Sequence, residues 1–146
     1  MLPSKNESSA MMIDHISLAV ADLIRSKRFY DACLEPLGIA PDEVSEDSCS
    51  YESGGGVDFS IHQVGGRPMI LPPPESHYAF VAPTREAVDR FFEAALSAGG
   101  RDDGPPGLRP EYHSDYYAAF VVDPDGHRIE AVCHLPDGYP GSGHIR

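Results

Sequence analysis

An internal repeat limits what this chain can fold into more than any other feature of the sequence. The segment RFYDACL, residues 28–34, matches RFFEAAL, residues 90–96, at a constant offset of 62 positions with four identities. The same offset carries His15 onto His77, and each histidine stands near the start of an apolar alternating run. Similarity at a fixed spacing indicates one structural unit that occurs twice. The sequence therefore predicts two related modules.

Each module is predicted to start with a strand that leads into an amphipathic helix. Residues 15–20 alternate between apolar and polar side chains, which is typical of a strand with two different faces. In the first module, Asp22 is the expected helix N-cap and Gly38 the expected stop. In the second, Thr84 is the expected N-cap and Gly99 follows the last apolar turn. The phenylalanines at helical spacing in both segments are predicted to lie in the core.

Strand-like segments interrupted by glycine follow each helix. They are SCSYES and VDFSIHQV in the first half, and YYAAFVV and HRIEAVCH in the second. Each half is therefore predicted to have the order β-α-β-β-β. Asp125 and Gly126 join two strands and are expected to provide the positive φ angles of a tight hairpin turn. His127 directly follows this turn and is expected to be exposed.

Glycine and proline mark the boundaries between these units. Gly65 to Pro74 contains two glycines and four prolines, which favours a connector over regular structure. The predicted organisation is a disordered leader at 1–11, a first module at 12–63, a linker at 64–75, a second module at 76–134 and a tail at 135–146.

Four polar side chains are predicted to occupy matched strand positions on the sheet faces that point away from the helices. When the last strands of the two modules are superposed, Asp58 aligns with Glu130, and His15 already aligns with His77. Two imidazoles and two carboxylates form a nitrogen and oxygen donor set that suits Zn, Ni, Mn, Fe(II) or Co, without choosing among them. Each histidine taken alone is better explained as a hydrogen-bonded strand residue than as a ligand, and it is the matched placement of the two together with Glu130 that favours a metal. Glu130 and Asp58 are also the candidate groups for moving a proton.

An aromatic cluster in the second module supplies the candidate pocket residues. Tyr112, His113 and Tyr117 are predicted to line a substrate pocket, although tyrosines close together on strands also pack across strands. The sequence has no phosphate-binding glycine loop of the GxGxxG type and no serine nucleophile elbow.

Composition narrows the partners that this chain can bind. The 146 residues carry a formal net charge of −12, which disfavours nucleic acid and anionic membrane and allows a cation or a metal. Three cysteines without CxxC spacing suggest neither a disulfide framework nor a thiolate zinc site, and they fit a reducing compartment. The sequence offers no apolar stretch of signal-peptide or membrane-span type, so we expect a cytoplasmic protein.

A family resemblance covers residues 12–134. The segments MIDHISLAVADLIRSKRFYDACLEPLGI, SHYAF and YYAAFVVDPDGHRIEAV resemble the vicinal oxygen chelate superfamily, which contains glyoxalase I, bleomycin-resistance proteins, fosfomycin-resistance proteins and extradiol dioxygenases. The resemblance implies an α+β fold in which two βαβββ modules form a curved mixed sheet around a cavity. It also implies metal binding at His15, Asp58, His77 and Glu130, with Asp58 standing where glyoxalase-type members usually have Glu.

The resemblance further implies a divalent-metal-dependent enzyme that chelates neighbouring oxygens of a small substrate, usually as a homodimer. Ala19 stands where glutathione-using members tend to carry Arg, which disfavours a glutathione substrate. Phe120 stands where ring-cleaving dioxygenases have Tyr, so lyase or isomerase chemistry is favoured over ring cleavage. The alternative from another class is a metal-free binding protein of the bleomycin-resistance type, which holds a cationic drug.

Overall fold

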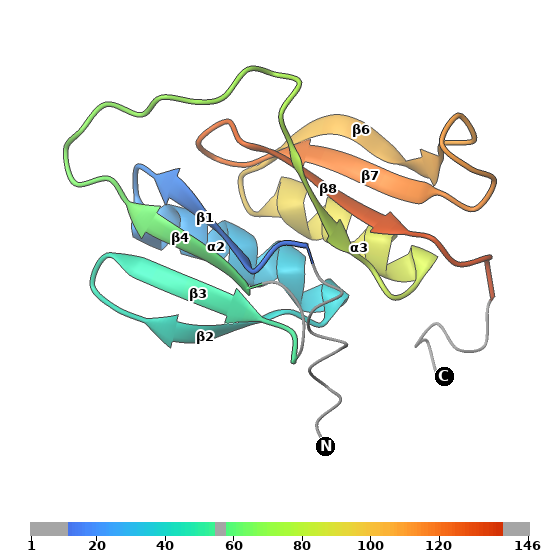
Figure 1. Cartoon of the computed structure of the whole chain (residues 1–146), viewed down its shortest axis with the longest axis horizontal. Helices are drawn as coiled ribbons and strands as arrows, with labels where there is room; N and C mark the ends of the chain where they lie inside the picture. Colours follow the sequence, from blue (N-terminus) through green and yellow to red (C-terminus); the bar gives the residue numbers. More distant parts are fainter. Residues whose placement is uncertain (1–11, 55–57, 139–146) are drawn as a thin grey trace.

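Two four-stranded sheets, each with one helix packed against it, make up the part of the chain that the structure describes, residues 12–54 and 58–138 of a computed structural model. In Figure 1 the sheets lie side by side, and the connector between them arches over one end. The two helices contact each other and join the modules. This arrangement confirms the predicted α+β fold with two βαβββ modules.

The first module runs from β1 to β4 in the sheet order β1-β4-β3-β2. Its strands β1 and β4 are parallel and the other pairs are antiparallel. Its elements are β1 (His15–Val20), α2 (Leu23–Leu34), the 3₁₀ helix η1 (Glu35–Leu37), β2 (Ala40–Val44), β3 (Ser48–Glu52) and β4 (Asp58–Gln63).

The second module repeats this plan in the order β5-β8-β7-β6, again with its first and last strands parallel. Its elements are β5 (Tyr78–Val81), α3 (Arg85–Ser97), β6 (Arg101–Leu108), β7 (Tyr117–Val122) and β8 (Arg128–Cys133). No helix in the described residues is long and apolar enough to cross a bilayer.

Both predicted helix starts are confirmed by their capping bonds. The Asp22 carboxylate accepts the backbone N–H of Arg25 at 3.2 Å, and the Thr84 hydroxyl accepts that of Ala87 at 2.9 Å. Each cap satisfies an N–H that the first turn of a helix leaves without a partner. Gly38 ends the first helical segment with φ 82°, as expected of a glycine stop.

Two strands, β2 and β6, form the outer edges of their sheets and were not located from the sequence. Their sequences, APDEV and RDDGPPGL, carry prolines and, in β6, glycines, and they lack a run of alternating apolar residues. An edge strand tolerates proline because one side of it needs no ladder hydrogen bonds. Both strands also show irregular register against their neighbours.

The core lies between the helices and one face of each sheet. It is built around buried aromatic and branched side chains, among them Phe29, Tyr30, Tyr51, Phe91 and Ile129. Cys33, Cys49 and Cys133 are free thiols and also buried. Because strand residues alternate, burying one face of each sheet against a helix leaves the opposite face to carry other side chains. We call this opposite side the open face.

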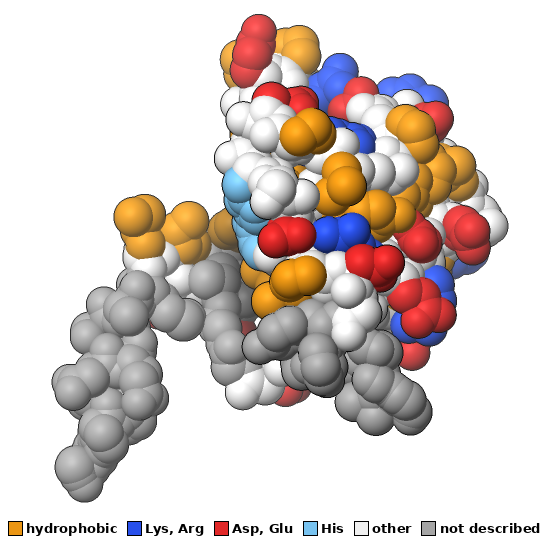
Figure 2. All heavy atoms as spheres, turned by 90° about the vertical axis from the view of Figure 1, so that its right-hand side faces the viewer, with side chains coloured by type: hydrophobic (Ala, Val, Ile, Leu, Met, Phe, Trp, Pro, Cys, Tyr) orange, Lys and Arg blue, Asp and Glu red, His pale blue; other side chains and the backbone are white. Residues whose placement is uncertain are grey.

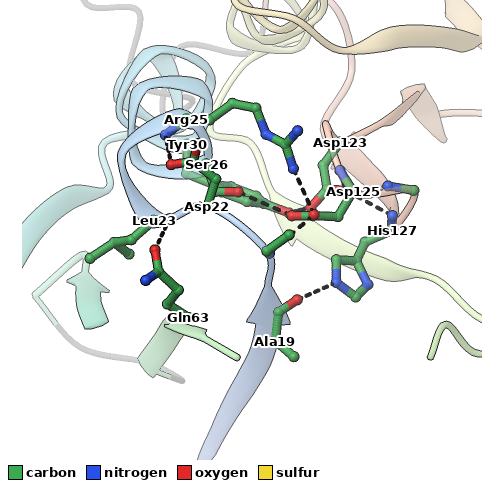
Figure 3. Close-up of polar contacts among 12 residues, drawn as sticks. Ala19, Asp22, Leu23, Arg25, Ser26, Tyr30, Gln63, Asp123, Asp125 and His127 are labelled. Carbon is green, nitrogen blue, oxygen red and sulfur yellow. Dashed lines mark hydrogen bonds and ion pairs between the residues drawn. The ribbon is translucent and has the colours of Figure 1, made fainter. Parts of the chain in front are cut away.

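A polar network locks the turn between β7 and β8 onto the first module (Figure 3). Asp125 accepts hydrogen bonds from the Arg25 guanidinium at 2.7 Å, the Ser26 hydroxyl at 3.1 Å and the backbone N–H of Ala21 at 3.2 Å. The Tyr30 hydroxyl donates to Asp123 at 2.6 Å, where both side chains are buried. The DPDG motif and the start of α2 therefore bind each other across the two modules.

Two expectations about this turn were wrong. Only Gly126 has a positive φ, at 110°, and Asp125 does not, because the turn is held by three backbone N–H groups that bond to Asp123. His127 is 5% exposed rather than on the surface, and its Nε2 lies 2.8 Å from the backbone oxygen of Ala19. The first module covers this histidine, which is why local sequence suggested exposure.

Candidate metal and substrate site

The strongest candidate site centres on a buried carboxylate on the open face of the second sheet. Glu130 lies in β8 and is 1% exposed. Its Oε1 is 3.0 Å from His77 Nε2, and its Oε2 accepts the Tyr116 hydroxyl at 2.5 Å. Both oxygens of the carboxylate are therefore engaged. The structure brings together His77 and Glu130, two of the four predicted ligands.

The strand order explains how these side chains meet. In β7, Phe120 pairs with Glu130 across the ladder, and its ring lies edge-on to the His77 imidazole at 5.9 Å between centroids. His77 directly precedes β5, which runs parallel to β8. Tyr116 directly precedes β7 and reaches back over the sheet. The two strands on either side of β8 thus surround the carboxylate, with His77 next to β5, Tyr116 next to β7 and Phe120 within β7.

Tyr116 acts as a hydrogen-bond donor in this group. Desolvation, followed by its hydrogen bond to Glu130 and the charge of that carboxylate, raises the pKa of the Tyr116 phenol well above 10. The hydroxyl therefore keeps its proton at neutral pH and stabilises the carboxylate that it faces. Tyr116 was not among the predicted pocket residues, although it directly precedes Tyr117 in the sequence, because alternation alone did not show which of the two tyrosines faces Glu130.

Two further histidines extend the site toward the surface. His113 Nδ1 accepts the backbone N–H of Asp115 at 3.1 Å, so Nε2 carries the proton and donates to His134 Nδ1 at 3.0 Å. The two rings stack, and Tyr116 packs against both edge-on. Figure 2, which views the molecule from the right-hand side of Figure 1, shows histidine side chains gathered in a strip toward the left of that view. His134 was not predicted for the site, and its position just after β8 was the available signal.

The predicted pocket residues separate into two groups. Tyr112 is 63% exposed and its ring lies 4.7 Å from that of Tyr116, so it stands beside the site together with His113. Tyr117 points to the helix side, where its hydroxyl donates to Asp89 on α3 at 2.7 Å. Desolvation and the Asp89 hydrogen bond raise the pKa of Tyr117 to about 12. The structure therefore does not bring Tyr117 to Glu130.

The other two predicted ligands lie on the open face of the first sheet. His15 and Asp58 are direct cross-strand partners in β1 and β4, and both are exposed. The register differs from the alignment expected between the modules. Glu130 pairs with Ala79, whose repeat equivalent is Ser17, and Ser17 pairs with Ser60. Ser60 rather than Asp58 therefore occupies the position that corresponds to Glu130.

Two of the four predicted donors lie at the right separation to bind one metal ion. A nitrogen and an oxygen 3.0 Å apart, as in His77 and Glu130, match neighbouring ligands of an ion bound at about 2.0–2.2 Å. In residues 12–54 and 58–138, no three His, Cys, Asp or Glu side chains come close enough together to hold a metal ion. One chain therefore offers two matching donors at this position, and His15 and Asp58 on the other sheet are not joined to them.

Comparisons with known proteins agree with this architecture. A family model described as "Glyoxalase/Bleomycin resistance protein/Dioxygenase superfamily" matches residues 12–131. A glyoxalase/bleomycin resistance protein from Albidiferax ferrireducens is 35% identical, with a TM-score of 0.74 over 85% of this chain and 99% of that one. A glyoxalase-related enzyme from Fulvimarina pelagi is 26% identical, with a TM-score of 0.66 over 89% and 94% of the two chains.

Fosfomycin resistance protein FosX from Mesorhizobium loti shares the fold at 20% identity, with a TM-score of 0.62 over 85% of this chain and 92% of that one. A comparison with curated proteins found no match.

Proposed function

Because the chain belongs to the glyoxalase/bleomycin resistance protein/dioxygenase superfamily, we propose that it is a divalent-metal-dependent enzyme acting on a small oxygen-bearing substrate. The observation that carries the proposal is the pair formed by His77 and Glu130, with a nitrogen and an oxygen 3.0 Å apart on the open face. Glu130 is buried, and a buried charge is costly unless polar groups surround it. The fold provides those groups at this position, which is typical of a functional site.

The metal set requires a third ligand, and we propose that His15 of a second copy of the chain supplies it. Within the described residues of one chain, no further His, Cys, Asp or Glu joins the pair. His15 is the repeat equivalent of His77 and lies exposed on an open face of its own. Two copies that face each other would each give one pair to a shared site. Asp58, beside His15, is proposed as an additional ligand or base.

In this proposal the metal supplies Lewis acidity that stabilises negative charge developing on neighbouring substrate oxygens, worth several kcal/mol. The chain's own residues do the rest. Tyr116 donates its hydroxyl to one oxygen of Glu130 and so positions the carboxylate, while the other oxygen lies 3.0 Å from His77 Nε2, where the two atoms would bind the metal as neighbouring ligands. Glu130 and Asp58 are the proposed proton acceptors. Tyr112 and His113 border the site and contact the substrate.

Lyase or isomerase chemistry is proposed in preference to ring cleavage. Phe120 faces the His77 ring and has no hydroxyl to orient a catechol. We also propose a cytoplasmic location, which the three buried free thiols support because free thiols persist in a reducing compartment.

Metal titration of purified protein tests the ligand set. Wild type is expected to bind one Zn²⁺, Ni²⁺ or Mn²⁺ per site by calorimetry and elemental analysis. The His77→Ala and Glu130→Gln variants are expected to lose at least tenfold in affinity. His134→Ala is a matched control, because His134 lies near the site without being a proposed ligand. Equal affinity in all four proteins would exclude this ligand set.

Mixing two inactive variants tests whether the site is shared. Consider a mixed dimer with one His15→Ala chain and one His77→Ala chain. If each site takes His15 from one chain and His77 from the other, both substitutions fall in the same site and the second site keeps all its ligands. Metal binding should therefore return to half of the wild-type stoichiometry in the mixed dimer. A site confined to one chain would be damaged in every copy, and mixing would restore nothing.

A metal-free binding protein of the bleomycin-resistance type is the second candidate. The net charge of −12 favours a cationic ligand, and such a function needs no third donor. Calorimetric titration with a cationic glycopeptide separates the two proposals. Tight, salt-sensitive binding together with no metal binding would favour this candidate.

A further inference from the structure

The open face of the first sheet contains a cavity of about 520 Å³ that the proposed metal chemistry leaves unassigned. It lies between β2, β3 and β4 and the turn that joins β2 to β3. Its polar lining is provided by four serines, one carboxylate and one imidazole: Ser45, Ser48, Ser50, Ser60, Glu43 and His62. A cavity of this size is within the range that holds small ligands.

The register of the sheet places this cavity next to the proposed reacting centre. His15 and Asp58 form one cross-strand pair, and Ser17 and Ser60 form the next pair on the same face. Two residues along a strand span about 6.6 Å. A substrate held at His15 would therefore extend toward Ser60 and His62, which line the cavity.

Hydrogen bonds orient the groups that line the cavity. The Ser60 hydroxyl lies 3.0 Å from both the Ser17 hydroxyl and His62 Nε2. The Ser50 hydroxyl accepts the backbone N–H of Glu43 at 3.2 Å. A wall of fixed hydroxyls suits a ligand that itself carries hydroxyl groups, because each can act as donor or acceptor.

The negative charge of the chain segment around the cavity disfavours binding of anions. Residues 29–66 include eight Asp and Glu and no Lys or Arg. Among the ion pairs of the described residues, only Asp31 of this segment takes part, with Lys27. Glu43 lines the cavity, and no Lys or Arg is among the residues that line it. A phosphate or carboxylate would be repelled here, whereas an ammonium group would be attracted.

We propose that this cavity binds the distal end of the substrate, and that this end is a hydroxylated amine, such as an amino sugar. The inference rests on the proposed function, because it takes the end of the sheet at His15 as the reacting end. Glu43 faces the ammonium group, while Ser48, Ser60 and His62 bind hydroxyls. The resulting preference is for substrates that are neutral or cationic at the end remote from the metal.

Three sugars that differ in charge test the proposal on the metal-free full chain. Glucosamine, glucose and glucose 6-phosphate are titrated at millimolar concentration into nitrogen-15 labelled protein, and amide shifts are followed at residues 43–50 and 60–62. Glucosamine is expected to bind about fivefold tighter than glucose, which corresponds to about 1 kcal/mol. Glucose 6-phosphate is expected to leave these amides unmoved. Added salt should reduce the preference for the amine.

Glu43→Gln should bind glucosamine no tighter than glucose, whereas Glu46→Gln, which does not line the cavity, should keep the preference. The inference is overturned if no sugar moves these amides, if glucose 6-phosphate binds as well as glucosamine, or if Glu43→Gln keeps the preference. These readouts need no metal. A failure of the proposed function would appear in the metal titration alone, while a failure of this inference would appear in the sugar titration alone.

Discussion

Replacing Tyr30 by Phe tests the polar lock between the modules most directly. The hydroxyl of Tyr30 donates to Asp123 Oδ2 at 2.6 Å, and the two side chains are 0% and 3% exposed. Phenylalanine keeps the ring and its packing but leaves that oxygen without its donor. The other oxygen keeps its three backbone N–H bonds in the turn. The change therefore isolates one buried hydrogen bond to a carboxylate.

Such a bond contributes about 1.5–3 kcal/mol. We expect Tyr30→Phe to lower the free energy of unfolding by about 2 kcal/mol and Tm by about 4–8 °C. Urea unfolding followed by circular dichroism measures the loss, and the slope with urea should not change. Tyr78→Phe is the matched control, because its ring packs against the core while its hydroxyl makes no hydrogen bond within the described residues. A loss below about 0.5 kcal/mol in Tyr30→Phe, or an equal loss in the control, would refute the reasoning.

Three further outcomes are expected. Burial, and then the charge of Asp123, raises the pKa of Tyr30 well above 10, so its contribution is complete below pH 10 and declines as pH rises further. The part of the stability that Tyr30 contributes should fall by about 1.4 kcal/mol per pH unit above pH 10, so in urea melts from pH 9 to 11 the stability of Tyr30→Phe should fall less steeply than that of wild type by about this amount. Gly100→Ala should cost about 1–3 kcal/mol in thermal unfolding, because its Cβ would lie 2.6 Å from Phe29 Cε1; unchanged Tm would contradict this. Burial raises the pKa of the Cys33 thiol, so a disulfide reagent at pH 8 should label it only in urea, and rapid labelling of native protein would count against its burial.

The repeat and the helix caps made the fold predictable. The starts of both helices could be predicted from Asp22 and Thr84, because a capping side chain bonds to an N–H group only three residues away. Edge strands β2 and β6 gave no comparable signal, since their pairing depends on a neighbouring strand rather than on local alternation. Local patterns were therefore sufficient for the centre of each sheet and insufficient for its edge.

The sequence predicted which residues belong to the candidate site better than it predicted which of them contact one another. Glu130 and His77 were identified from the repeat, but the superposition of Asp58 with Glu130 was displaced by two residues, because Ser60 holds the corresponding position. Sequence spacing does not determine where a strand begins relative to its parallel neighbour, because a helix and two other strands intervene. The same limit explains Tyr117, whose position on the helix side follows from its pairing with Cys133.

The lock between the DPDG turn and α2 also sets how freely the connector can change. Side chains of Arg25, Ser26 and Tyr30 bind the DPDG turn, and the two helices contact each other. None of these contacts between the two modules involves a residue of the connector. The connector is then mainly a tether that keeps the halves at high local concentration. Two polypeptides divided near residue 70 would still have every group needed to recognise each other and reassemble.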